Sequence, residues 1–134
     1  MTKKPPFILV VDDEPIVAHT LVQILESEGY SASYVSNGAA AVQWAGEMRP
    51  DIVICDVLMP TLNGIEAAKQ IREIVPTTHV ILFSGQAAAA GLTEKAAKEG
   101  YNFEVLAKPI KPEVLLAVIA RYLRLPGAKT ASER

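Results

Sequence analysis

The chain alternates between two kinds of segment, and this alternation constrains its fold more than any other feature. Short apolar runs, rich in β-branched residues, are separated by longer stretches in which apolar residues recur at helical spacing. Continuous apolar runs of this length predict strands that are buried on both faces of a parallel sheet. The runs are 7–11 (FILVV), 31–35 (SASYV), 51–55 (DIVIC), 78–83 (THVILF) and 103–107 (FEVLA). The run at 31–35 alternates small polar with apolar residues, which is more typical of an edge strand.

The longer stretches carry the signals of helices. Pro15 suits the first turn of the first helix, and Gly29 suits its C-terminal end. The predicted helices are 14–28, 38–48, 64–74, 91–99 and 112–124. A strand followed by a helix, repeated five times, predicts a doubly wound (βα)5 fold of the α/β class, with parallel strands and right-handed crossovers.

Composition narrows the classes of protein to which the chain can belong. Its 134 residues, of which 50% are hydrophobic and 21% are charged, predict one globular domain at 1–125 and a flexible tail at 126–134. A net charge of -2 argues against direct binding to nucleic acid, which normally needs a basic patch. No apolar window approaches the ~20 residues of a membrane span. The single cysteine, Cys55, cannot form an internal disulfide, which fits a reducing compartment, so we expect a cytoplasmic protein.

Polar side chains follow four of the five predicted strands, at the edge where open parallel sheets bind ligands. They are Asp12 and Asp13 after the first strand, Asp56 after the third, Ser84 after the fourth and Lys108 after the fifth. Taken alone, Asp13 could cap a helix, and Asp56 and Ser84 could be turn residues. Their conjunction at one edge favours a functional site, because their chemistries are complementary.

Three carboxylates at one sheet edge repel one another, and at least one pKa must rise unless a cation compensates. A hard divalent ion such as Mg²⁺ binds carboxylates, waters and phosphate oxygens. A lysine and a hydroxyl opposite such an ion would complete a pocket for a phosphoryl group. The conjunction therefore predicts phosphoryl transfer to a carboxylate, with positioning and charge neutralisation supplying most of the catalysis.

Four segments of the chain resemble the motifs of response-regulator receiver domains from two-component signalling. They are VVDDEP (10–15), DVLMPTLNGIE (56–66), FSG (83–85) and AKP (107–109). They occur in the family's order and at strand ends, and the resemblance covers roughly residues 7–124. It implies a stand-alone receiver with a flavodoxin-like sheet of strand order 2-1-3-4-5.

The resemblance implies a role for each matching residue. Asp56 would be the phospho-acceptor, and Ser84 and Lys108 would bind phosphoryl oxygens. Mg²⁺ or Mn²⁺ would be held by Asp12, Asp13, Asp56 and the backbone carbonyl of Leu58. Structural roles would fall to Pro60, Gly64, Gly85 and Pro109. The Lys108–Pro109 peptide bond would be cis, which is a feature of proline.

The resemblance also implies partners. The phosphoryl donor would be a phosphohistidine on a sensor histidine kinase or a histidine phosphotransfer domain, and the signal would pass to an unidentified downstream protein. Candidate docking residues are Ile16 and Thr20 on the first helix and Ile110 after the fifth strand; each could equally be an ordinary residue at the edge of the core. The chain would be a signalling protein with at most slow self-catalysed phosphorylation and autodephosphorylation, and not a conventional enzyme.

Two positions depart from the family pattern. Many receivers carry Tyr or Phe three residues before the lysine, where this chain has Val105. Phe103, two residues earlier on the same predicted strand face, is a candidate substitute. Asn63 stands where aspartate is frequent, but that position is not a metal ligand.

Other function classes have less support from the sequence. A phosphorylation-independent adaptor with the same fold stays open, because Val105 leaves the readout of phosphorylation undefined. A haloacid-dehalogenase-type phosphatase needs a second aspartate two residues after the nucleophile, where this chain has Leu58. A nucleotide-binding fold needs a Gly-rich loop after the first strand, where DDEP stands.

Overall fold

The computed structural model describes residues 4–60, 62–85 and 88–124. Within them, five parallel strands form one sheet in the order β2-β1-β3-β4-β5, which confirms the predicted (βα)5 fold of the α/β class. The strands are β1 (Phe7–Val11), β2 (Ser31–Val35), β3 (Ile52–Asp56), β4 (His79–Ser84) and β5 (Glu104–Ala107). The helices are α1 (Pro15–Ser27), α2 (Gly38–Met48), α3 (Gly64–Ile74), α4 (Ala88–Lys98) and α5 (Pro112–Leu123). The predicted tail at 126–134 lies outside the described residues.

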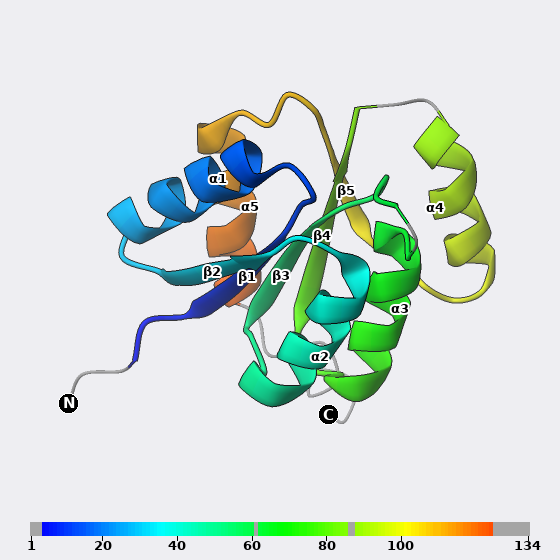
Figure 1. Cartoon of the computed structure of the whole chain (residues 1–134), viewed down its shortest axis with the longest axis horizontal. Helices are drawn as coiled ribbons and strands as arrows, with labels where there is room; N and C mark the ends of the chain where they lie inside the picture. The colour runs from blue at the N-terminus through cyan, green and yellow to red at the C-terminus, as the bar shows by residue number, and fades with distance from the viewer. Residues whose placement is uncertain (1–3, 61, 86–87, 125–134) are drawn as a thin grey trace.

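Helices cover both faces of the sheet (Figure 1). Side chains of α1 and α5 pack with Ile8 and Val10 of β1 on one face. Side chains of α2 and α3 pack with Leu9 and Val11 on the other face. Successive residues of a strand point to opposite faces, so a strand covered on both faces is apolar at every position. This burial explains why β1 is a continuous apolar run.

The predicted boundaries of the elements agree with the structure to within three residues. β1, β2, α2 and α3 have the predicted bounds. α4 begins at Ala88 rather than at 91, because the preceding alanines are strong helix formers. β3 and β4 begin and end one residue later than predicted, so Asp56 and Ser84 are the last residues of their strands. Among the described helices, none is long and apolar enough to cross a membrane.

The edges of the sheet are β2 and β5, and the alternating pattern at 31–35 had indicated the first of these. β5 exposes Val105, with 42% of its surface accessible. Phe103 precedes β5 instead of belonging to it, and its ring stacks on Tyr101 with centroids 5.9 Å apart. The Arg72 guanidinium of α3 lies 5.0 Å from the Phe103 ring centroid. Phe103 is therefore held beside α3 and does not lie on the face of β5 as predicted.

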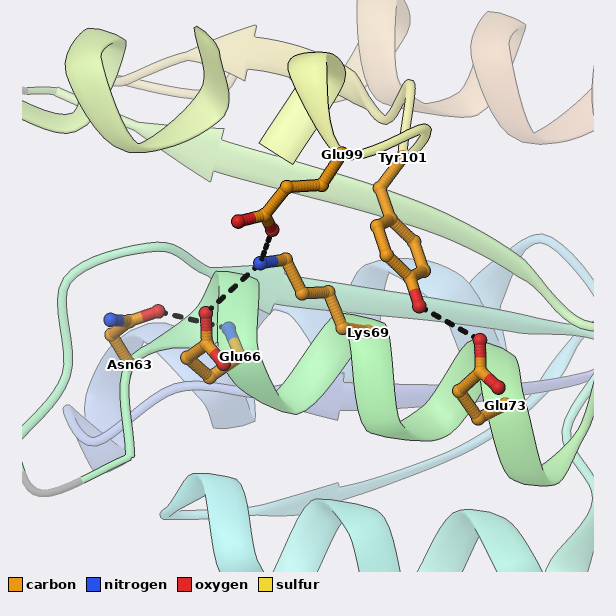
Figure 2. Close-up of polar contacts among 6 residues, drawn as sticks. All are labelled: Asn63, Glu66, Lys69, Glu73, Glu99 and Tyr101. Carbon is orange, nitrogen blue, oxygen red and sulfur yellow. Dashed lines mark hydrogen bonds and ion pairs between the residues drawn. The ribbon is translucent and has the colours of Figure 1, made fainter. Parts of the chain in front are cut away.

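Polar contacts join the end of α4 and the segment after it to α3 (Figure 2). Lys69 of α3 forms ion pairs with Glu66 and with Glu99, which follows α4. The Tyr101 hydroxyl donates a hydrogen bond of 2.8 Å to Glu73 of α3. Exposed contacts of this kind contribute little stability each. They position this end of α4 without adding much to the free energy of folding.

The start of α3 lies directly against the end of β3. The Asn63 side chain caps α3 by accepting a hydrogen bond of 3.0 Å from the Glu66 N–H, so asparagine keeps the cap that an aspartate could also make. The Gly64 N–H donates to the carbonyl of Val57 at 2.8 Å. A Cβ on Gly64 would lie 1.9 Å from the backbone oxygen of Asp56. A glycine is therefore required at this position, in line with the structural role that the resemblance implied.

Replacement of Gly64 by alanine is expected to destabilise the protein by about 3 kcal/mol, because the new methyl group would force α3 away from β3. Gly91→Ala is the matched control, since nothing lies within 4 Å of the Cβ position there. Alanine in that helix interior should stabilise by about 0.5–1 kcal/mol. Urea unfolding followed by circular dichroism measures both. Similar effects of the two substitutions would contradict the close approach of α3 to β3.

Candidate functional site

The C-terminal edge of the sheet brings the predicted polar residues together. Asp12 is fully buried after β1 and Asp56 is 4% exposed at the end of β3, whereas Asp13 is exposed. One carboxylate oxygen from each of these three residues lies within 4.8 Å of the other two. A pocket of about 490 Å³ at this edge is lined by Asp13, Glu14, Asp56, Leu58, Ser84, Gly85 and Lys108.

Lys108 supplies positive charge to this acidic pocket. Its Nζ donates a hydrogen bond of 3.2 Å to Oδ2 of Asp56, and it lies 5.2 Å from the ring centroid of the buried Phe83. Its backbone N–H donates to the Ser84 carbonyl at 3.0 Å and so joins the ends of β5 and β4. A Cβ on Gly85 would lie 3.1 Å from the Cβ of Lys108, so glycine there leaves room for the lysine.

Backbone N–H groups hold two of the carboxylates in place. Oδ1 of Asp12 accepts a hydrogen bond of 2.8 Å from the Glu14 N–H, and Oδ1 of Asp56 accepts one of 3.3 Å from the Leu58 N–H. The interpretation of Asp13 as a helix cap is wrong, because Glu14 is the N-cap residue of α1 and no side chain caps that helix. The interpretation of Asp56 as a turn residue accounts for Oδ1, which accepts the hydrogen bond from Leu58, but not for Oδ2, which pairs with Lys108.

Burial raises the pKa of both Asp12 and Asp56 above that of an exposed aspartate, and the charge of Asp56 raises the pKa of Asp12 further. The hydrogen bond from Lys108 opposes this rise at Asp56. Within the described residues, Oδ2 of Asp12 is buried without a hydrogen-bond partner. A hard cation would supply that partner, and a set of carboxylate oxygens suits Mg²⁺ or Mn²⁺.

An apolar groove of about 590 Å³ adjoins the acidic pocket. The three docking residues predicted from the resemblance, Ile16, Thr20 and Ile110, all line this groove, and Ile16 is 83% exposed. The residues that line both cavities are Glu14, Gly85 and Lys108. Glu14 is absent from the predicted site, although the third acid of DDEP was a visible signal for it.

Two prolines complete the predicted set of site residues. Pro60 and Pro109 are exposed in the loops that follow β3 and β5. The Lys108–Pro109 peptide bond is cis, as the resemblance implied. Neither proline lines the acidic pocket, whereas Pro109 lines the adjoining apolar groove.

Comparison with known proteins decides the family. The sequence matches the family model described as "Response regulator receiver domain" over residues 8–120. The chain belongs to this family. Receiver-domain proteins act in signalling and are generally not classed as enzymes.

Relatives of this receiver domain differ in length. It is 36% identical over 114 residues to the chemotaxis protein CheY of Halobacterium salinarum, a match that covers 83% of this chain and 92% of that protein. It is 31% identical over 131 residues to the probable transcriptional regulatory protein TcrX of Mycobacterium tuberculosis. That match covers 95% of this chain and 53% of TcrX, so the chain spans about half of that relative.

Solved structures agree with the family. A response regulator receiver domain protein from Clostridium thermocellum is 30% identical in sequence and matches with a TM-score of 0.81. The match covers 89% of this chain and 94% of that one. The predicted flavodoxin-like sheet is therefore confirmed by both its strand order and its structural relatives.

Asp12→Asn is expected to raise the melting temperature of the metal-free protein at pH 7 by about 3 °C, which corresponds to about 1 kcal/mol. A raised pKa means that the folded state binds a proton at Asp12 more readily than the unfolded state, so the ionised carboxylate costs stability at neutral pH. The amide removes this charge, and its oxygen can still accept the hydrogen bond from the Glu14 N–H. Thermal unfolding followed by circular dichroism measures the change.

The advantage of Asp12→Asn should shrink as the pH falls from 7 toward about 3.9, the value for aspartate in an unfolded chain. Over this range the wild-type carboxyl becomes protonated first in the folded state, so the wild type regains the lost stability. Glu26→Gln, at an exposed position of α1, is the control and should show no such gain. A melting temperature of Asp12→Asn at or below that of the wild type at pH 7 would argue against this electrostatic cost.

Proposed function

We propose that this receiver accepts a phosphoryl group on Asp56 from a phosphohistidine of a sensor histidine kinase or histidine phosphotransfer domain. One observation carries the proposal. The Asp56 carboxylate lies 3.2 Å from the Lys108 ammonium, and one carboxylate oxygen each of Asp12 and Asp13 lies within 4.8 Å of an Asp56 oxygen. Membership of the receiver family supports this role for the acidic pocket.

In the proposed step an oxygen of Asp56 attacks phosphorus, and the bond from phosphorus to the donor nitrogen breaks with its electron pair going to that nitrogen. Lys108 pairs with one phosphoryl oxygen and the Ser84 hydroxyl donates a hydrogen bond to another. Mg²⁺ or Mn²⁺, when bound, supplies further neutralisation of the phosphoryl charge. The residues that would hold the ion are Asp12, Asp13, Asp56 and Leu58, the last through its backbone carbonyl.

These groups position the phosphoryl group and neutralise its charge without covalent chemistry of their own. The proposed protein is therefore a signalling acceptor with at most slow self-catalysed phosphorylation and autodephosphorylation. It is not a conventional enzyme.

The signal would arise at the ends of β4 and β5. Phosphorylation replaces the single charge of the Asp56 carboxylate by a phosphoryl group that carries up to two negative charges, and this group would attract Ser84 and Lys108. The segment that follows Ser84 leads into α4, whose opposite end is joined to α3 (Figure 2). The phosphoryl group can shift the population of α4 arrangements if it interacts differently with each. An unidentified downstream protein would then read the altered surface.

The apolar groove is the proposed site for the donor protein. An apolar side chain of the donor would contact Ile16, Thr20 and Ile110. Its phosphohistidine would reach Asp56 past the residues that line both cavities. We further propose a cytoplasmic receiver domain spanning 1–125 that has no direct contact with nucleic acid or membrane.

Val105 favours a second candidate function. It is exposed on β5, at the position where many receivers carry the aromatic residue that responds to phosphorylation. A phosphorylation-independent adaptor would use this surface for binding in a single state. The two functions differ in whether Asp56 is modified.

Incubation with Mg²⁺ and acetyl phosphate is expected to add one phosphoryl group to the wild type and none to Asp56→Asn, because the amide is not a nucleophile at this position. Intact-mass measurement should show the single adduct, which should be stable to acid and labile to base as an acyl phosphate. An unmodified wild type would favour the adaptor. An undiminished adduct on Asp56→Asn would contradict the assignment of the acceptor.

Removal of the divalent ion with EDTA is expected to slow this phosphorylation about tenfold or more, because metal neutralisation of the phosphoryl charge contributes several kcal/mol. Addition of Mg²⁺ or Mn²⁺ in excess should restore the rate. The same intact-mass time course measures both. Equal rates with and without EDTA would refute the metal requirement and leave the acceptor role of Asp56 intact.

A further inference from the structure

Glu14 occupies the junction between the acidic pocket and the apolar groove. It lines both cavities, together with Gly85 and Lys108. A donor that occupies the groove and reaches Asp56 across these shared residues lies beside this junction. Glu14 is therefore placed to contact the part of the donor that adjoins the transferred phosphoryl group.

The backbone of Glu14 is held in place from both sides. Its N–H donates to Oδ1 of Asp12 at 2.8 Å, and its carbonyl accepts a hydrogen bond of 3.0 Å from the Ala18 N–H in the first turn of α1. Pro15 follows at the first position of the helix, where its ring restricts the backbone. The side chain thus projects from a fixed point beside the acidic pocket.

The carboxylate of Glu14 has no hydrogen-bonding role in the helix that it precedes. Its side chain makes no capping hydrogen bond, and among the described contacts of the chain no ion pair or side-chain hydrogen bond includes it. The residue is exposed. A negative charge beside two further acids opposes the approach of a phosphoryl dianion, so Glu14 makes electrostatic sense at this junction if the donor brings a positive charge with it.

We propose that the Glu14 carboxylate contacts the imidazole of the donor phosphohistidine and selects donors whose leaving group is an imidazole over donors whose leaving group is a carboxylate. This inference rests on the proposed function of Asp56. A phosphorylated imidazole carries a proton on its second ring nitrogen when it is cationic, and a carboxylate that accepts this N–H favours the cationic form. An acyl phosphate has no such N–H and releases a carboxylate, which Glu14 repels.

The step balances in charge and atoms. An oxygen of Asp56 forms the new bond to phosphorus, the nitrogen–phosphorus bond breaks, and its electron pair stays on that nitrogen. The second ring nitrogen keeps its proton, held by Glu14, so the donor departs as neutral imidazole. Without that proton it would depart as imidazolate, a far poorer leaving group.

The test compares two small donors, N-phosphorylimidazole and acetyl phosphate, in the presence of Mg²⁺. Second-order rate constants for phosphorylation of Asp56 are measured by intact mass for the wild type, Glu14→Gln, Glu14→Asp and the control Glu26→Gln. Glu14→Gln is expected to lower the rate with N-phosphorylimidazole about tenfold, as expected for loss of one charge-assisted hydrogen bond. Its rate with acetyl phosphate should stay equal or rise.

Glu14→Asp should restore most of the preference for N-phosphorylimidazole, and Glu26→Gln should leave both rates unchanged. A purely structural role of Glu14 would change the two rates by the same factor. An unchanged ratio of the two rates in Glu14→Gln would therefore overturn the proposal. Failure of the wild type to react with either donor would instead refute the proposed function of Asp56, and with it the role of Glu14.

Discussion

Two buried carboxylates, those of Asp12 and Asp56, lie beside the Lys108 ammonium, and their charges set the electrostatic requirements of this whole edge of the sheet. Asp12 follows β1 and Asp56 ends β3, and both strands are covered on both faces, so the same burial that stabilises the sheet removes water from their charges. Burial raises the pKa of each, and one hydrogen bond from Lys108 offsets part of this at Asp56. The fold thus holds an electrostatic cost at this edge that a cation or a proton would relieve.

The elements around the acidic pocket determine which groups can approach its charges. Gly64 lets α3 start against β3, and Gly85 leaves room for Lys108. The apolar groove meets the acidic pocket at Glu14. α4 follows the β4 end of the site and is joined to α3 at its other end through Lys69. A change of charge at the pocket therefore occurs next to α4, a helix whose far end is joined to α3 by exposed polar contacts.

Much of the candidate site could be predicted because its residues occupy positions that sequence patterns define. Asp12 and Asp56 stand at the ends of apolar runs, and the rule that parallel strands share one binding edge brings them together. Glu14 could not be ranked in this way, since a glutamate at the start of a helix is commonly explained by its favourable interaction with the helix dipole. Phe103 was misplaced because its packing beside Arg72 and Tyr101 depends on α3, a contact between segments far apart in the chain.

The order of strands and helices along the chain, the class of fold and the acids and lysine of the pocket could all be predicted from the residues, because local periodicity and strand ends encode them. Packing of the whole chain decided which charges lose their water and which of them Lys108 compensates, because burial and distance exist only in the folded protein. It also decided that Val105 is exposed on an edge strand and that Glu14 lies where two cavities meet. Both depend on neighbours contributed by several elements, and no single segment of the sequence carries that information.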